Sequence, residues 1–235
     1  MDLTDSYLRF VRSSILSRYQ LFETRNAAAL LGVTNPEHFL DVLDVLDEFV
    51  LYTRDLITAG GSESDLASRL NSAFRTRGWR ESRVDTKITL RLQKFPFHEQ
   101  GEVSGQVSET EVVNEGYKVD NFIGRVALDV EWNAKDGNLD RDLSAYRFLY
   151  DSGLIDAAVI ITRTSQDLRD LAYRLGIEAG MPDDKAKRIL GTTTTTNTMK
   201  LLPRIKRGDG GGCPLLVVAI TSATWEGVTN KPCFD

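Results

Sequence analysis

The chain is poor in the residues that build disulfide frameworks and histidine-rich metal sites. Its 235 residues include two cysteines, Cys213 and Cys233, and two histidines, His38 and His98. Two thiols without further framework favour a reducing cytoplasm over a secreted, disulfide-rich class of protein. With only two histidines, we do not expect a His-rich zinc site.

Long apolar runs are also missing. The longest, PLLVVAI at 214–220, is far shorter than the roughly 20 residues of a membrane-spanning helix. The first ten residues, MDLTDSYLRF, lack a basic stretch followed by an apolar run, so we expect no signal peptide. These absences predict a cytoplasmic protein with no membrane partner. A net charge of −5 weighs against a generic basic nucleic-acid coat protein but leaves a local basic surface open.

The hydrophobic content of 41% is ample for a globular core, and its periodicity changes along the chain. Residues 5–58 have helical spacing, and 86–92 alternate as a strand does. Residues 94–116 are polar, and we expect a loop or excursion with short strands there. Further elements are predicted as a hairpin at 116–134, helices at 138–153 (capped by Asn138), 165–177 and 198–208 (interrupted by Pro203), and buried strands at 155–162 and 213–221.

This order predicts an α/β fold in which a mixed central β-sheet is flanked by helices. We expect one domain over residues 1–235, with a mainly helical part at 1–77. Residues 78–235 would form the sheet core.

The predicted hairpin contains an unusual set of acids in the stretch VALDVEWNAK, residues 126–135. Side chains alternate along a strand, so Asp129 and Glu131 share one face while the other face is apolar. If Gly124 and Arg125 form the turn, Asp120 lies directly opposite Asp129, with Cβ atoms roughly 5 Å apart. Three carboxylates would then converge in one patch.

Two interpretations of this patch stay open at this point. Opposed like charges destabilise a sheet unless something compensates, and oxygen-rich ligation favours Mg²⁺ over zinc as the compensating cation. Alternatively, the patch is a solvated edge, with Lys118 opposite Glu131 as a salt bridge.

The stretch DNFIGRVALDVEWNAK, residues 120–135, resembles the active-site hairpin of type II restriction endonucleases of the BglII and BstYI group. That group belongs to the PD-(D/E)XK nuclease superfamily. Its hairpin has an Asp, a gap of eight residues, an acid, one apolar residue and a polar third position. Asp120, Asp129 and Glu131 match that spacing. The likeness extends to the segments at 78–83, 154–162 and 192–221, and so covers roughly residues 70–235.

The resemblance implies a PD-(D/E)XK restriction-endonuclease-like fold and Mg²⁺-dependent hydrolysis of DNA phosphodiester bonds. Asp120 and Asp129 would hold the ion, and Glu131 would be a ligand, a general base, or both. BglII-like enzymes usually carry Glu-x-Gln where this chain has Asp129-Val130-Glu131; an acid at the third position is similar to BamHI. Asn71, on the helix before the sheet, is a further polar candidate whose simpler interpretation is an ordinary helix-face residue.

The same resemblance indicates residues that contact DNA, since recognition requires donors and acceptors aimed at base edges. Asn133 and Lys135 follow the catalytic strand; a surface turn is their alternative interpretation. The tract Thr192–Asn197 matches the recognition loop, with an unpaired polar strand as the alternative. Basic residues gather in two clusters, which could bind phosphates or simply lie at helix ends: Arg75, Arg77, Arg80 and Arg83, then Lys200, Arg204, Lys206 and Arg207. The DNA-binding candidates are therefore Asn133, Lys135, Thr193, Thr194, Thr195, Thr196, Asn197, Arg204 and Lys206.

The favoured function is a homodimeric, Mg²⁺-dependent restriction endonuclease that cuts double-stranded DNA at a palindrome. One chain carries one carboxylate cluster, and two-fold protein symmetry mirrors palindromic DNA. A cognate DNA methyltransferase is expected as a separate protein. Two other classes stay open: a non-catalytic DNA- or partner-binding protein on the same fold, and a repair or modification-dependent nuclease.

Overall fold

The computed structural model describes residues 1–58, 65–95 and 106–229, so His98 and Cys233 lie outside the described residues. The chain divides into two compact units. The larger unit comprises Met1–Ser82 and Val119–Asp235, and the smaller comprises Arg83–Lys118. Every residue expected to take part in catalysis belongs to the larger unit.

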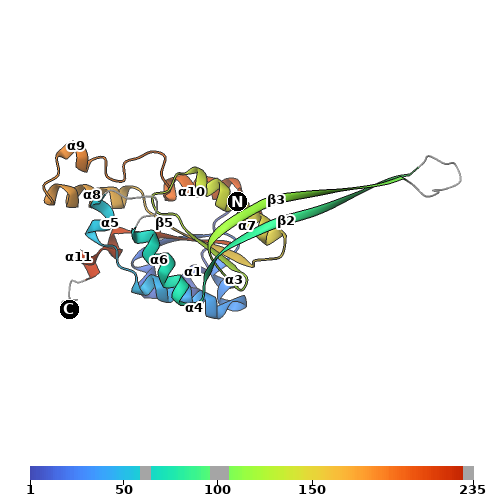
Figure 1. Ribbon diagram of the computed structural model, residues 1–235. Coiled ribbons are helices and arrows are strands. Elements are labelled where there is room, and N and C mark those ends of the chain that lie inside the picture. The colour runs from blue at the N-terminus through green and yellow to red at the C-terminus, as the bar shows by residue number, and fades with distance from the viewer. Residues whose placement is uncertain (59–64, 96–105, 230–235) are drawn as a thin grey trace. The chain divides into compact units, whose positions relative to one another are not determined.

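A mixed six-stranded sheet with the order β1-β6-β5-β4-β3-β2 organises the fold (Figure 1). Strand β5 pairs in parallel with β4 and β6, while β1 with β6 and β3 with β4 are antiparallel. The strands are β1 (Tyr19–Glu23), β2 (Arg80–Lys94), β3 (Gln106–Ile123), β4 (Val126–Val130), β5 (Ala157–Arg163) and β6 (Leu215–Ile220). The predicted α/β class with a mixed central sheet is therefore confirmed.

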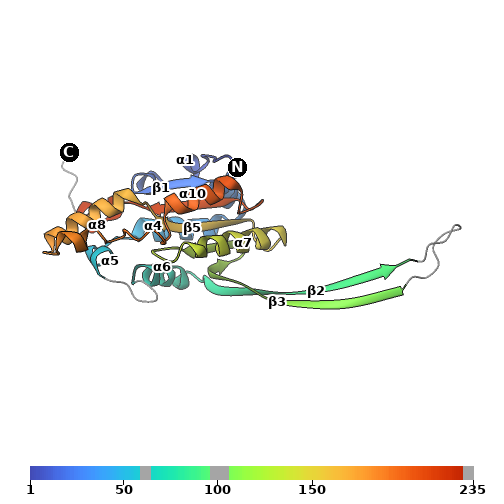
Figure 2. The ribbon, with the colours of Figure 1, turned by 90° about the horizontal axis from the view of Figure 1, so that it is seen from above.

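Helices cover both faces of the part of the sheet formed by β4, β5 and β6; in Figure 1, α10 lies on one side and α4 on the other, and Figure 2 shows the side of α7 and α10 from above. Their bounds are α1 (Tyr7–Phe10), α2 (Ser13–Leu16), α3 (Ala27–Thr34), α4 (Pro36–Glu48), α5 (Thr53–Ile57), α6 (Asp65–Thr76), α7 (Gly137–Asp151), α8 (Gln166–Glu178), α9 (Asp183–Ala186), α10 (Thr198–Arg207) and α11 (Glu226–Thr229). A short 3₁₀ helix spans Ser222–Thr224.

Strands β4, β5 and β6 are buried along their whole length, as expected for strands covered on both faces. One face joins Leu128 and Val130 to Val159, Val218 and the buried sides of α3, α4, α6 and α8 in a single core cluster. The opposite face carries Asp129 and is covered by α7, whose Tyr146 hydroxyl reaches that carboxylate. Asp129 therefore lies between the sheet and α7.

The smaller unit consists of residues from two neighbouring strands, β2 and β3. Ion pairs link the strands, among them Lys87 with Glu111 (2.9 Å) and Arg91 with Glu109 (3.7 Å). Ile88, Leu90 and Leu92, at alternate positions of β2, stay exposed.

Four local predictions differ from the structure. In the segment 94–116, where we expected a loop with short strands, the long strand β3 begins at Gln106. Residues 96–105 of this segment lie outside the described residues. The part predicted to be helical contains strand β1. Helix α7 is preceded by Asp136 rather than capped by Asn138, and α10 continues through Pro203 without interruption. Strand β1 escaped prediction because its partner β6 lies almost 200 residues away, and pairing with β6, not local propensity, fixes it.

No helix in the described ranges is both long and apolar enough to cross a membrane.

Candidate active site

The β3–β4 hairpin turns at Gly124, as the sequence predicts. Gly124 has a positive φ of 53°, and a Cβ there would come within 2.6 Å of His38 Nε2, so both backbone and space favour glycine. Asn121 pairs with Leu128 and Ile123 with Val126, so the predicted register is confirmed.

This register places Asp120 beside Asp129. The backbone N–H of Asp120 donates to Asp129 Oδ1 at 2.8 Å, and the backbone N–H of Val130 donates to the Asp120 carboxylate. Two main-chain donors thus hold the two acids in fixed positions across the hairpin. Glu131 follows immediately, and its own N–H bonds to the carbonyl of Ile161 on β5 at 2.8 Å.

Burial excludes the solvated-edge interpretation of the patch. Asp129 is 3% exposed and Glu131 is 4% exposed, while Asp120 is intermediate. An ionised carboxylate taken out of water is costly unless a cation or several donors compensate. The patch therefore needs a compensating partner.

Helix α7 adds two polar side chains, one turn apart. Tyr146 donates its hydroxyl to Asp129 Oδ2 at 2.5 Å. Asp142 is only 1% exposed, and its Oδ1 accepts from Arg141 Nη2 at 2.9 Å and Nε at 3.1 Å. Arg141 pairs with Asp142, and its side chain is 55% exposed.

The electrostatics follow from this crowding. Burial, followed by the charges of Asp142 and Asp120, raises the pKa of Asp129. Burial and then the neighbouring Asp142 also raise the pKa of Glu131. The pKa of Asp120 is raised by burial and then by the Asp142 charge, and that of Asp142 by burial. Without a cation, the site therefore retains protons that ordinary carboxyl groups have lost at neutral pH.

The donor set suits a hard divalent cation, since every candidate ligand is an oxygen. Glu131 Oε2 and Asp142 Oδ2 are buried oxygens without a hydrogen-bond partner among the described residues. Within the described ranges, however, no three acid, histidine or cysteine side chains already stand in a metal-holding arrangement. A cation would have to draw the carboxylates together from their present hydrogen bonds.

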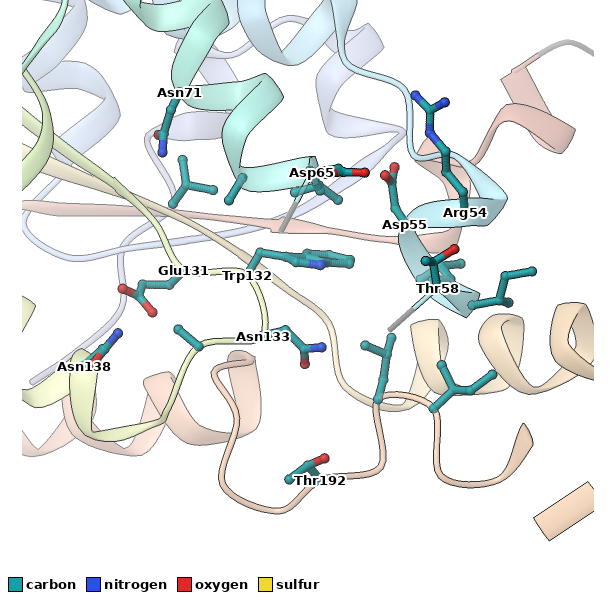
Figure 3. A pocket seen from close by; sticks show the side chains of 18 of the residues that line it. Arg54, Asp55, Thr58, Asp65, Asn71, Glu131, Trp132, Asn133, Asn138 and Thr192 are labelled. Atoms are coloured by element: carbon teal, nitrogen blue, oxygen red, sulfur yellow. The ribbon is translucent and has the colours of Figure 1, made fainter. Parts of the chain in front are cut away.

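A pocket of about 810 Å³ opens beside these acids. Asp120 and Glu131 form part of its wall, together with Arg141 and Asn138 of α7. Figure 3 shows Glu131 and Asn133 on neighbouring positions of this wall, with Asn71 projecting from α6. Asp120 and Glu131 can therefore be reached from solvent through the pocket.

Asn71, the polar candidate from the helix before the sheet, lines the same pocket and is 5% exposed. Its Oδ1 accepts from Asn121 Nδ2 at 2.8 Å. Asn121 is the neighbour of Asp120, so this hydrogen bond links α6 to the strand that carries Asp120.

The two loops expected to recognise DNA lie against each other. Lys135 and Thr195 form an isolated antiparallel bridge, and Asp136 N–H bonds to Thr194 O at 2.8 Å. Asn133 and Lys135 are exposed, as are Thr193 and Thr194. The exposed members of both loops thus form one surface.

The remaining loop candidates are occupied by bonds within the protein. Thr196 is fully buried, and its hydroxyl donates to the carbonyl of Glu131 at 2.9 Å. Asn197 caps α10 by accepting from Lys200 N at 3.3 Å. Thr195 Oγ1 donates to Thr192 O and accepts from Arg163 Nη2, each at 3.2 Å.

The two basic candidates on α10 differ. Arg204 donates to both oxygens of Asp140, at 2.7 and 2.9 Å, whereas Lys206 is exposed. Arg204 therefore ties α10 to α7 and is not available to a phosphate while that pair persists.

Sequence reasoning overlooked three residues, Asp142, Tyr146 and Arg163. The signal for the first two was an acid and a phenol within the apolar stripe of α7, where Leu139 and Leu143 are buried. Arg163 ends the apolar strand β5 and is fully buried; its Nε has no hydrogen-bond partner among the described residues. Burial lowers its pKa to about 10.

Comparison with known proteins agrees with this geometry. A family model described as Restriction endonuclease BglII/BglIII matches residues 19–220, most of the 235-residue chain. Among curated proteins, the search returned no match. The matched range contains the β3–β4 hairpin, Asp142 on α7 and the two loops that carry Lys135 and Thr195. The chain therefore belongs to the BglII/BglIII restriction endonuclease family.

Proposed function

We propose that this chain is a type II restriction endonuclease that hydrolyses phosphodiester bonds of double-stranded DNA at a palindromic site. It would require Mg²⁺ and act as a homodimer. The observation that carries the proposal is the pair Asp120 and Asp129, opposed across the hairpin, with Asp120 lining a pocket. Membership of a nuclease family supplies the reaction class.

The chemistry assigns separate tasks to the acids. Asp120 and Asp129 would hold Mg²⁺ against the scissile phosphate, with the hairpin register fixing their spacing. When bound, the ion would stabilise negative charge on the phosphate and assist ionisation of the attacking water. Glu131 would orient that water, and it would accept the water's proton only once a bound cation had displaced the proton that its raised pKa otherwise retains.

DNA would be read by the surface formed by the two bonded loops. Asn133, Lys135, Thr193 and Thr194 offer exposed donors and acceptors for bases and phosphates. Thr195, Thr196 and Asn197, whose side chains are bonded within the protein, would shape the loop rather than contact DNA directly. Lys206 would contribute a phosphate contact, and Arg204 would do so only after leaving Asp140.

The proposed homodimer follows from the presence of one carboxylate cluster in each chain. One hairpin cluster cuts one strand, so cutting both strands at a fixed place is most simply done by two chains related by a two-fold axis. A palindromic target mirrors that axis. We place the enzyme in the cytoplasm, where host DNA would be protected by a separate methyltransferase.

Digestion of unmethylated phage DNA tests this function. Purified protein with Mg²⁺ should give discrete fragments whose sequenced ends share one palindrome, and light scattering should give the mass of two chains. DNA binding without cleavage would favour the non-catalytic alternative. Cuts at asymmetric sites by a monomer would favour the repair-type nuclease.

A further inference from the structure

Asp142 is a buried acid that the proposed mechanism does not use. It is 1% exposed and comes from α7, a different element from the hairpin that carries the other three acids. Arg141 bonds only to its Oδ1. Oδ2 is buried and has no partner among the described residues.

Glu131, like Asp142, has one buried carboxylate oxygen, Oε2, without a hydrogen-bond partner among the described residues. The carboxyl groups of Glu131 and Asp142 lie within hydrogen-bonding reach of each other. Two ionised carboxylates cannot hydrogen-bond each other, so a proton or a cation must lie between the two carboxyl groups.

The charge balance favours a cation. Asp120, Asp129, Glu131 and Asp142 interact with one another electrostatically, and Arg141, which pairs with Asp142, has a half-exposed side chain. One arginine cannot offset four ionised carboxylates, so the cation-free group retains protons, and a divalent cation would replace them. Glu131 also lines the pocket, which provides a route by which a hydrated ion could enter.

We propose that Glu131 and Asp142 hold a divalent cation between Oε2 and Oδ2, at a position separate from the Asp120–Asp129 pair. Asp142 is then a ligand of the active site supplied by α7. The inference deepens the proposed function because it adds a ligand to the same site, and it makes Glu131 a ligand rather than only a base.

Calcium binding to the purified chain without DNA, measured by calorimetry, tests this assignment. Asp142→Asn should weaken Ca²⁺ binding at least about tenfold, because losing even an outer-shell partner of a metal ligand costs 10–100-fold in affinity. Asp151→Asn is the matched control: it removes the same charge from the exposed end of the same helix and should leave affinity unchanged.

A double-mutant cycle separates a shared cation from two independent effects. Glu131→Gln should also weaken binding, and the double variant should lose little more than either single variant. Circular dichroism identifies any variant that fails to fold. If one single variant does not fold, the Ca²⁺ affinity of the other still tests the assignment. Wild-type affinity in Asp142→Asn, or fully additive losses, would overturn the assignment.

The two proposals fail in different ways. If wild-type protein binds Ca²⁺ through Asp142 but cuts no DNA with Mg²⁺, the cation position stands and the nuclease function falls. If it cuts DNA and Asp142→Asn binds Ca²⁺ as the wild type does, only the cation position falls.

Discussion

The buried acids should make the cation-free protein less stable as the pH rises. The pKa values of Asp120, Asp129, Glu131 and Asp142 are all raised in the folded chain, whereas unfolded carboxyls titrate near 4. Between these values the folded state binds more protons than the unfolded state. The free energy of unfolding must then fall with increasing pH.

The size of the effect follows from proton counting. For each proton that the folded state binds and the unfolded state does not, the free energy of unfolding falls by about 1.4 kcal/mol per pH unit. One such proton between pH 6 and pH 8 costs about 3 kcal/mol. For a chain of this length, 1 kcal/mol shifts Tm by roughly 2–4 °C, so Tm should fall by roughly 6–12 °C over that interval.

Differential scanning calorimetry in EDTA at pH 6, 7 and 8 measures this fall. Asp129→Asn should flatten the dependence and raise Tm at pH 8, because it removes a buried charge from the cluster. Asp151→Asn, on exposed surface, should behave as the wild type. Added Ca²⁺ should stabilise the wild type more at pH 8 than at pH 6. A wild-type Tm that is constant or rises from pH 6 to pH 8 in EDTA would refute the reasoning.

Three further outcomes are expected. Glu131→Gln, which matches the BglII-like pattern at this position, should keep some cleavage while Glu131→Ala loses far more; equal, trivial losses in a cleavage assay would show that the side chain is unimportant. Thr196→Val should lower the cleavage rate at the cognate site more than it weakens DNA binding, because it removes the bond to the Glu131 carbonyl, and Thr196→Ser should restore it; an unchanged rate-to-affinity ratio would contradict this coupling. Arg163→Met should lower specificity for the cognate sequence in a competition assay, because Arg163 joins Asn133 and Thr195 beneath both loops; unchanged discrimination would exclude that role.

The part of the site on the hairpin could be predicted because it is local. A glycine turn with a fixed number of residues on either side sets the register, and the register sets which side chains meet. Asp120 and Asp129 were therefore paired correctly from spacing alone. The buried strands β5 and β6 could also be predicted from the sequence, because a short continuous apolar run is typical of a strand covered on both faces.

The parts of the site and fold that could not be predicted from the sequence depend on contacts between segments far apart in the chain. Asp142 meets Glu131 only because α7 packs over the face of β4 that carries the acids, and no spacing rule links a helix to a strand in that way. The bond from Thr196 to Glu131 spans 65 residues. Helix α10 runs through Pro203 because buried Leu201 and Ile205 on either side anchor it, although proline alone favours a break.

The most direct test of the central claim compares cleavage and binding at one mapped DNA site. Wild-type protein and Asp129→Asn are assayed for cleavage with Mg²⁺ and for binding with Ca²⁺ on the same duplex. If Asp120 and Asp129 form the catalytic pair, the wild type cuts both strands at fixed positions. Asp129→Asn then cuts neither strand while binding the duplex at least as tightly, because the patch repels phosphate less. Full cleavage by Asp129→Asn would contradict the account.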